Sequence, residues 1–210
     1  IIFDCGMEPS DVYVYTSNID DYSAQIKVME HFKGYAQGGI VKTEIISPQG
    51  EVLHCQENYC EERESILYFD VEVPQLWYPV PYGAQPLYTL KITVDGNVLT
   101  EKFGIRTVKI LQLKDKDEQA IEKCKELQRT ESGKQYDQNE EYSGFIPIIN
   151  GVKIYCTGAN WVPCEPFPSA ETEEKITRIL EMAAAAGINM IRVWGGGLFE
   201  MQHFYAECDR

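Results

Sequence analysis

The sequence has no apolar stretch that approaches the ~20 residues of a membrane-spanning helix. Its first residues, IIFDCGMEPS, lack the basic start and the long apolar centre of a signal peptide. No Asn-x-Ser/Thr acceptor for N-glycosylation occurs anywhere in it. These absences predict a protein without a membrane partner and favour a cytoplasmic, reducing location.

Basic residues are scarce relative to acidic ones. The chain has 19 Lys and Arg against 33 Asp and Glu, which gives a formal net charge of -14. Nucleic acids and anionic lipid surfaces are bound through clustered Lys and Arg. The charge balance therefore predicts no nucleic-acid partner, and it suits neutral or cationic ligands.

The seven cysteines are odd in number and irregular in spacing, at positions 5, 55, 60, 124, 156, 164 and 208. A secreted disulfide scaffold is shorter and more regular. The stretch HCQENYC brings His54, Cys55 and Cys60 close together in the sequence. Its spacing is just allowed for zinc but a fourth ligand is missing nearby, so a metal site, a cross-strand disulfide and free thiols all stay open.

Residues 11–110 have the pattern of short β-strands. Apolar residues alternate with polar ones in several segments, and this period of two predicts strands with one buried and one exposed face. The buried sets are Ala24, Ile26 and Val28; Leu67, Phe69, Val71 and Val73; and Tyr88, Leu90, Ile92 and Val94. Turn sequences at 47–50 and 95–97 separate strands. About seven short strands in about 100 residues predict an all-β immunoglobulin-like sandwich.

Residues 111–143 are highly charged and nearly free of large apolar groups. A short helix could place Ala120, Ile121, Cys124 and Leu127 on one face. We interpret this segment as a linker or surface insertion without chemistry of its own.

Residues 144–210 change to an alternating strand and helix pattern. An Asn150-Gly151 hairpin turn precedes a strand at 153–158, KIYCTG. Ser169 is the expected cap of the following helix, and Gly187 is its stop signal. A strand at 188–194, INMIRVW, has the apolar character of one buried on both faces, and LFEMQHFYAEC then begins a helix. This order predicts an α/β segment with a parallel sheet.

The glycines after the second of these strands allow two interpretations. A dinucleotide-binding loop would match at Gly195 and Gly197, but its third glycine position holds Glu200, a carboxylate where a phosphate would sit. Glu200 is better explained as a residue that caps or neutralises the helix N-terminus. The alternative is the rim of a parallel α/β barrel, where active sites lie at the C-terminal ends of strands.

Four side chains occupy that rim in the second interpretation: Arg192 and Trp194 on one face of their strand, and Asn160 and Trp161 after the preceding strand. Indole faces and amide groups suit sugars, which combine apolar C–H faces with many hydroxyls. The other explanation for Trp161 and Trp194 is that they are ordinary core residues.

Three stretches of the sequence resemble glycoside hydrolase family 2, and in particular its β-mannosidase branch. RVWGGGLFE followed by FYAECD resembles a motif at the second barrel strand of that family, and NGVKIYCTGANWVPCEPF resembles its first barrel strand. LWYPVPYGAQPLYTLKI and FGIRTVKI resemble the end of its immunoglobulin-like domain. The resemblance implies a sandwich followed by the first two βα units of a (β/α)8 TIM barrel, here incomplete.

The domains expected on this basis are the tail of a preceding segment (1–10), the sandwich (11–110), the charged linker (111–143) and the N-terminal part of the catalytic barrel (144–210). The resemblance implies a retaining, exo-acting hydrolase that removes terminal β-linked mannose from oligosaccharides or glycans. Both catalytic glutamates would lie downstream, so the fragment would be inactive alone and would act with the remaining domains of the same polypeptide.

The resemblance also implies site roles. Arg192 would support the nucleophilic carboxylate, and Trp194, Asn160 and Trp161 would bind substrate. No cofactor or metal is implied. The alternatives are another family 2 glycosidase, such as an exo-β-glucosaminidase or a β-galactosidase-like enzyme, and a non-catalytic carbohydrate-binding or structural sandwich.

Overall fold

The computed structural model describes residues 6–34, 38–114 and 143–210. The chain forms two compact units, one from residues up to 107 together with 157–210, and the other from 108–156. Within the described residues, no helix is long and apolar enough to cross a membrane. The helix expected around 120–127 lies outside the described residues.

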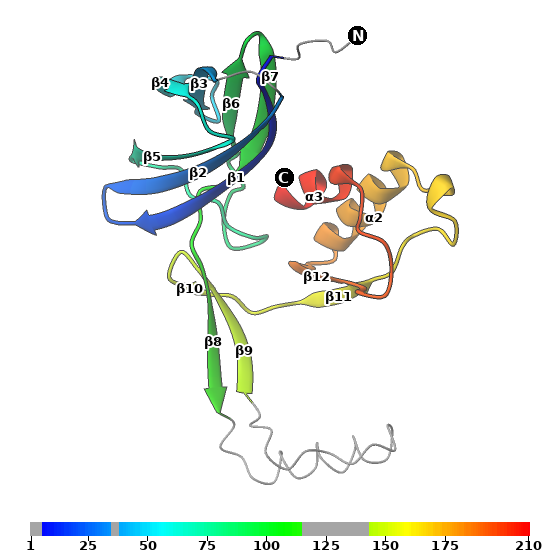
Figure 1. Cartoon of the computed structure of the whole chain (residues 1–210). Helices are drawn as coiled ribbons and strands as arrows, with labels where there is room; N and C mark the ends of the chain where they lie inside the picture. Colours follow the sequence, from blue (N-terminus) through cyan, green and yellow to red (C-terminus); the bar gives the residue numbers. More distant parts are fainter. Residues whose placement is uncertain (1–5, 35–37, 115–142) are drawn as a thin grey trace, which may run out of the picture. The chain divides into compact units, whose positions relative to one another are not determined.

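Seven antiparallel strands form two sheets that pack on one another in the first unit (Figure 1). One sheet has the order β1-β2-β5 and the other β4-β3-β6-β7. The strands are β1 (Glu8–Ile19), β2 (Ser23–Lys33), β3 (Gly39–Ile46), β4 (Val52–Cys60), β5 (Glu64–Glu72), β6 (Tyr88–Val94) and β7 (Asn97–Phe103). The prediction of a β-sandwich is therefore confirmed.

The sandwich core contains most of the alternating residues that the sequence predicted. Ala24, Ile26 and Val28 on β2 are fully buried, as are Leu90, Ile92 and Val94 on β6. Val73 is the exception, because β5 ends at Glu72 and Val73 turns outward with φ 45° and an exposed fraction of 84%. The Asp95-Gly96 turn between β6 and β7 has φ values of 48° and 84°, as a two-residue hairpin of this type requires.

The last strand-like stretch of the segment 11–110 is divided between two sheets. β7 ends at Phe103, and β8 (Val108–Lys114) pairs instead with β9 (Ser143–Ile149). The break has a packing cause, because a Cβ added at Gly104 would lie 2.7 Å from the side chain of Trp77. After Phe103 the backbone no longer pairs with β6 and runs beside Trp77. The backbone N–H of Trp77 donates to the carbonyl of Ile105 at 2.9 Å.

The second unit contains the three-stranded antiparallel sheet β8-β9-β10. β10 (Val152–Lys153) follows β9 through the predicted hairpin turn, in which Asn150 and Gly151 have φ values of 49° and 79°. The prediction of a strand over 153–158 is wrong, since β10 ends at Lys153 and the next strand begins at Gly158.

The remainder of the first unit alternates strands and helices: β11 (Gly158–Trp161), the 3₁₀ turn η1 (Pro168–Ala170), α2 (Glu173–Ala185), β12 (Met190–Val193) and α3 (Gln202–Asp209). β11 and β12 pair in parallel, as the strand–helix–strand pattern predicted. Ile176, Leu180, Trp161 and Phe204 form a small core between these strands and the helices.

Three details of this segment correct the sequence prediction. The cap of α2 is Thr172, whose hydroxyl accepts from the Lys175 N–H at 3.4 Å, while Ser169 lies in η1. β12 is buried on one face only, because Ile191 and Val193 pack on the core while Met190 and Arg192 are exposed. α3 starts at Gln202 rather than at 198. The stop at Gly187 is confirmed by its φ of 78°.

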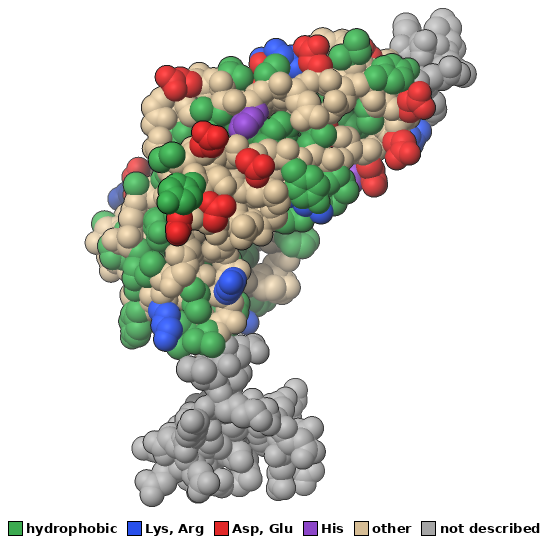
Figure 2. All heavy atoms as spheres, turned by 90° about the vertical axis from the view of Figure 1, so that its left-hand side faces the viewer, with side chains coloured by type: hydrophobic (Ala, Val, Ile, Leu, Met, Phe, Trp, Pro, Cys, Tyr) green, Lys and Arg blue, Asp and Glu red, His purple; other side chains and the backbone are tan. Residues whose placement is uncertain are grey.

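Acidic side chains are spread over one face of the molecule rather than gathered into one cluster (Figure 2). Hydrophobic side chains lie between them on the same face. This distribution agrees with the acidic composition of the chain.

Candidate functional site

The two parallel strands bring three of the four predicted site residues to one face. Asn160 on β11 is the register partner of Arg192 on β12, so their side chains point to the same side of the sheet. Trp194 follows directly after β12, and strand alternation places it on the same face. Asn160 and Arg192 are exposed, and Trp194 is 50% exposed. Among the described residues, Arg192 has no ion pair.

Trp161 lies on the other face. It is 6% exposed and packs with Ile176, Leu180 and Phe204, whose ring centroid is 4.9 Å from its own. The structure therefore does not bring Trp161 together with the other three residues. A sugar contact for it stays a prediction.

Glu200 bonds to Trp161 rather than to a helix end. The Trp161 indole Nε1–H donates to Glu200 Oε1 at 2.9 Å. The N-cap of α3 is Met201, which makes no side-chain capping bond. The interpretation of Glu200 as a helix cap is therefore wrong, and its neutralisation of the helix N-terminus stays a prediction.

The three glycines form the turn on which the Trp194 indole lies. A Cβ added at Gly196 would be 2.6 Å from Trp194 Cζ2, and one at Gly197 would be 3.1 Å from Trp194 Cε3. Apart from its chain neighbours Trp194 and Gly196, Gly195 has nothing within 4 Å of its added Cβ. Two of the three glycines therefore make room for the Trp194 side chain itself.

A cavity of about 510 Å³ opens beside this turn. Its walls are mainly apolar, and they also carry the carboxylates of Glu165, Glu171 and Glu200. Trp194 and Leu198 line it from the glycine turn. An apolar cavity with a few polar groups is the general form of a small-molecule site.

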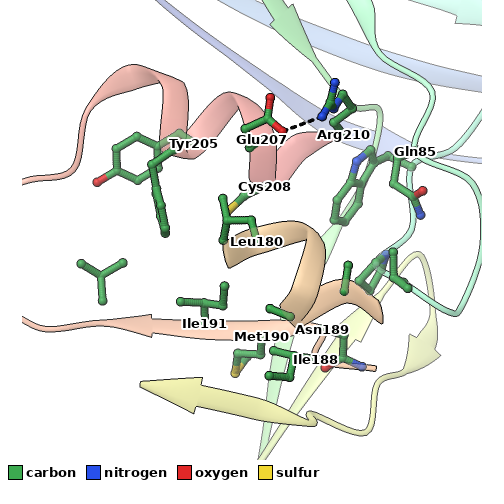
Figure 3. Close-up of a pocket in the computed structure, with 17 residues that line it drawn as sticks. Gln85, Leu180, Ile188, Asn189, Met190, Ile191, Tyr205, Glu207, Cys208 and Arg210 are labelled. Carbon is green, nitrogen blue, oxygen red and sulfur yellow. Dashed lines mark hydrogen bonds and ion pairs between the residues drawn. The ribbon is translucent and has the colours of Figure 1, made fainter. Parts of the chain in front are cut away.

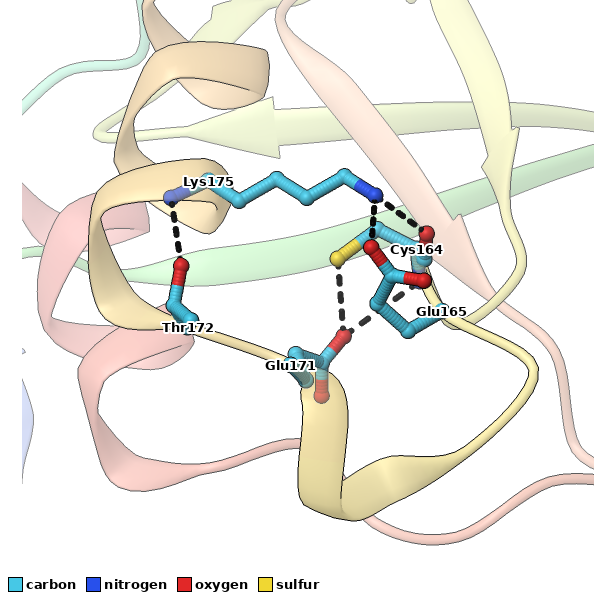
Figure 4. A network of polar contacts seen from close by, with 5 residues as sticks. All are labelled: Cys164, Glu165, Glu171, Thr172 and Lys175. Carbon is cyan, nitrogen blue, oxygen red and sulfur yellow. Dashed lines mark hydrogen bonds and ion pairs between the residues drawn. The ribbon is translucent and has the colours of Figure 1, made fainter.

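Each of these carboxylates has a partner within the protein. Figure 4 shows Lys175 reaching from α2 to Glu165, with which it forms an ion pair, and to the carbonyl of Cys164 at 2.8 Å. The Cys164 thiol donates to Glu171 Oε1 at 3.0 Å, and Glu200 accepts from Trp161. Each of the three is therefore engaged through one of its oxygens, Oε1. No regular spacing in the sequence indicated this network, because the ion pair joins Lys175 of α2 to Glu165 in the loop after β11.

Cys164 is held as a neutral thiol. Burial raises its pKa to about 11, and the hydrogen bond to the Glu171 carboxylate acts in the same direction. Because the thiolate is the reactive form of cysteine, the raised pKa disfavours reaction of Cys164 at neutral pH. Its hydrogen bond attaches the loop after β11 to Glu171, which lies between η1 and α2.

A second hollow, of about 340 Å³, lies between the sandwich loop that carries Trp77 and the helices α2 and α3 (Figure 3). Leu180, Ile188 and Ile191 line it from the helical side. It is predominantly apolar.

Trp77 connects the sandwich to the end of α3 at this hollow. Its indole Nε1–H donates to the carbonyl of Asp209 at 2.7 Å, and the Arg106 guanidinium lies 4.2 Å from its ring centroid. Arg106 also lies 3.9 Å from the Asp209 carboxylate. Burial raises the pKa of Asp209, and Arg106 opposes that shift. The hydrogen bond from Trp77 and the Arg106–Asp209 contact therefore join the sandwich to the end of α3.

The stretch HCQENYC does not form a site. Cys55 and Cys60 are free thiols, and His54 Nε2 is 2.9 Å from the carbonyl oxygen of Asp70. Among the residues that the structure describes, no group of three or more His, Cys, Asp or Glu side chains could hold a metal ion.

Sequence and structure comparisons place the chain in a family. Residues 10–106 match the model of the Glycosyl hydrolases family 2, and these residues span the sandwich. The chain belongs to this family.

Its relatives include β-mannosidases. Beta-mannosidase B of Emericella nidulans is 30% identical over 207 residues, which cover 95% of this chain and 22% of the relative. The crystal structure of the β-D-mannosidase of Dictyoglomus thermophilum is 29% identical with a TM-score of 0.72, covering 97% of this chain and 23% of that one. A β-glucuronidase of Parabacteroides merdae, 16% identical with a TM-score of 0.70 over 97% of this chain and 22% of its own, shares the fold. The chain thus spans about a fifth of the length of these relatives.

Proposed function

We propose that this chain belongs to a longer polypeptide that acts as a retaining, exo-acting β-mannosidase. In this proposal the sandwich is immunoglobulin-like, and β11, α2, β12 and α3 are the first two βα units of a (β/α)8 barrel. The observation that carries the proposal is the position of Asn160, Arg192 and Trp194, which share one exposed face at the C-terminal ends of two parallel strands. Active sites of such barrels lie at these strand ends.

Exposed apolar side chains around the strands support the barrel proposal. Val162, Phe167, Leu198 and Phe199 are 60%, 71%, 66% and 98% exposed. An exposed apolar surface of this kind indicates a region that another part of a protein covers. In a closed barrel, the following strands and their loops would cover it.

The chemistry requires two further carboxyl groups. A retaining glycosidase uses one as acid and base and the other as nucleophile, about 5–5.5 Å apart. The carboxylates around the cavity are engaged with Lys175, Cys164 and Trp161, so we place both catalytic groups in other parts of the polypeptide. No cofactor enters this mechanism.

Arg192 and Trp194 have distinct roles in the proposal. The Arg192 guanidinium would lie beside the nucleophilic carboxylate, orient it and keep it ionised. Trp194 would stack on the mannose ring and offer its indole N–H to a hydroxyl. Asn160, the register partner of Arg192, would bind a further hydroxyl.

The test is steady-state kinetics of the full-length polypeptide with an aryl β-mannoside. Arg192→Ala should lower kcat/KM roughly 30- to 150-fold, because a charge-assisted contact is worth about 2–3 kcal/mol. Trp194→Ala should have an effect of similar size. Arg178→Ala, which removes an exposed arginine of α2, is the matched control and should leave kcat/KM unchanged.

The melting temperature separates a site residue from a core residue. If Trp194→Ala keeps a normal kcat/KM while the melting temperature falls sharply, Trp194 is a core residue and the proposed site is wrong. Faster hydrolysis of a β-glucosaminide or β-galactoside than of the β-mannoside would instead favour another family 2 activity.

A further inference from the structure

The loop that begins at Trp194 has both of its ends attached to the same residue, Trp161. At the start, the Trp194 N–H donates to the Trp161 carbonyl at 2.9 Å. At the end, the Trp161 indole N–H donates to Glu200 Oε1 at 2.9 Å. One residue of β11 thus holds the loop through its backbone at one end and through its side chain at the other.

Trp161 is itself held firmly in place by its surroundings. It is 6% exposed, its ring packs on Phe204 of α3, and β11 holds it in register with Val193. A buried indole N–H that lost its acceptor would bear a desolvation penalty. The hydrogen bond between them therefore supplies the acceptor that the buried indole N–H of Trp161 requires, and it also fixes the position of the Glu200 side chain.

The segment between the two attachments has few other constraints. It contains the three glycines, followed by Leu198 and Phe199, whose side chains are 66% and 98% exposed. The hydrogen bond within the turn, from the Gly197 N–H to the Trp194 carbonyl, is long at 3.3 Å. The Trp194 indole lies against Gly196 and Gly197, so the path of this loop determines where that indole can lie.

We propose that Glu200 is a positioning residue that closes the loop onto Trp161 and thereby fixes the Trp194 indole at the sugar site. Glu200 does not contact the sugar in this proposal and has no part in the chemistry. The closure of the loop stands on the two hydrogen bonds alone. Its consequence for sugar binding rests on the proposed function.

Nuclear magnetic resonance of the 210-residue chain tests the closure directly, since its three tryptophans give three indole N–H signals. Glu200→Ala should shift the Trp161 indole signal, raise its hydrogen-exchange rate about tenfold and broaden the Trp194 signal, because one buried hydrogen bond is lost. Glu200→Gln keeps an acceptor oxygen and should restore most of the wild-type spectrum.

Trp161→Phe is the complementary variant, since it keeps an aromatic ring against Phe204 but removes the donor. If the two residues act as a pair, Trp161→Phe combined with Glu200→Ala should disturb Trp194 no more than either change alone. Leu198→Ala, within the same loop, is the control and should leave the Trp161 indole unchanged. Unchanged Trp161 and Trp194 signals in a folded Glu200→Ala chain would overturn the proposal.

Kinetics of the full-length polypeptide test the consequence for the sugar site. With an aryl β-mannoside, Glu200→Ala should lower kcat/KM about tenfold and Glu200→Gln should recover most of it. If the wild-type polypeptide hydrolyses no β-mannoside, the proposed function fails while the spectra still decide the closure. If the spectra change but kcat/KM does not, the closure exists and its role at the sugar site is refuted.

Discussion

At the scale of single residues, the glycine turn is shaped by its neighbour Trp194. Gly196 is the most restricted position of the turn, because an added Cβ would lie 2.6 Å from Trp194 Cζ2 and 2.8 Å from Cε2. Beyond its chain neighbours Trp194 and Gly196, Gly195 has open space around it. Two adjacent glycines therefore differ sharply in what a methyl group would meet.

This difference yields a paired prediction. Gly196→Ala should displace the Trp194 indole, increase acrylamide quenching of its fluorescence and lower kcat/KM of the full-length polypeptide about tenfold or more. Gly195→Ala should leave both measurements near wild type. Equal effects of the two changes would show that the turn needs glycine for its backbone rather than for the contact with Trp194.

A second residue with a measurable consequence is Glu30 in the sandwich core. It is 1% exposed, its Oε1 accepts from the Thr43 hydroxyl at 2.5 Å, and its Oε2 has no hydrogen-bond partner among the described residues. Burial raises the pKa of Glu30, although the hydrogen bonds to hydroxyl groups oppose the shift. Between its ordinary pKa of 4.5 and the raised value, the folded state binds more protons than the unfolded state.

The free energy of unfolding should therefore fall as pH rises through this window, by up to about 1.4 kcal/mol per pH unit. Glu30→Gln removes the titrating group but keeps a hydrogen-bonding side chain. Its melting temperature relative to wild type should rise from pH 4 to pH 7. A difference between the two that stays constant over this range would contradict a raised pKa for Glu30.

At the scale of elements, the sequence prediction and the structure differ in the residue that caps the start of α2. Thr172→Ala removes the side chain that caps the helix and should lower the free energy of unfolding by about 0.5–1 kcal/mol, measured by urea denaturation. Ser169→Ala, at the position that the sequence favoured, should change it by less than about 0.3 kcal/mol. The reverse order would mean that the helix begins earlier than the structure shows.

The strands were predictable where one face is apolar and the other polar. Ala24, Ile26 and Val28 needed only this alternation to be assigned to the core. The division of the strand near Gly104 was not predictable, because its cause is the side chain of Trp77, far away in the sequence. Local patterns carry hydrophobic periodicity and turn chemistry, and they carry no information on such distant contacts.

The candidate site was predicted in part for the same reason. Strand alternation placed Arg192 and Trp194 on one face, and the register of β11 with β12 added Asn160. The contact between Trp161 and Glu200 could not be predicted, because their hydrogen bond spans 39 positions in the sequence. The strand predicted at 153–158 ended before Trp161, so alternation gave that residue no face.

At the scale of the whole molecule, Trp77 connects the sandwich to α3. Trp77→Phe keeps a ring beneath Arg106 but removes the hydrogen bond to the Asp209 carbonyl. Backbone amides at the end of α3 should then exchange about tenfold faster, while amides in the middle of α2 keep their wild-type rates. Unchanged exchange at the end of α3 would show that the apolar contacts around the hollow are sufficient to hold the helix.

The central claim is that this chain contributes to the sugar site of a retaining β-mannosidase, and the most direct measurement is hydrolysis of a panel of aryl β-glycosides by the full-length polypeptide. The panel should contain the mannoside, glucoside, galactoside, glucosaminide and glucuronide, and proton NMR should follow the anomer that is released first. The account predicts that the β-mannoside is hydrolysed fastest and that the mannose released first is the β-anomer. Release of the α-anomer first, preference for another sugar, or no hydrolysis of any member would contradict it.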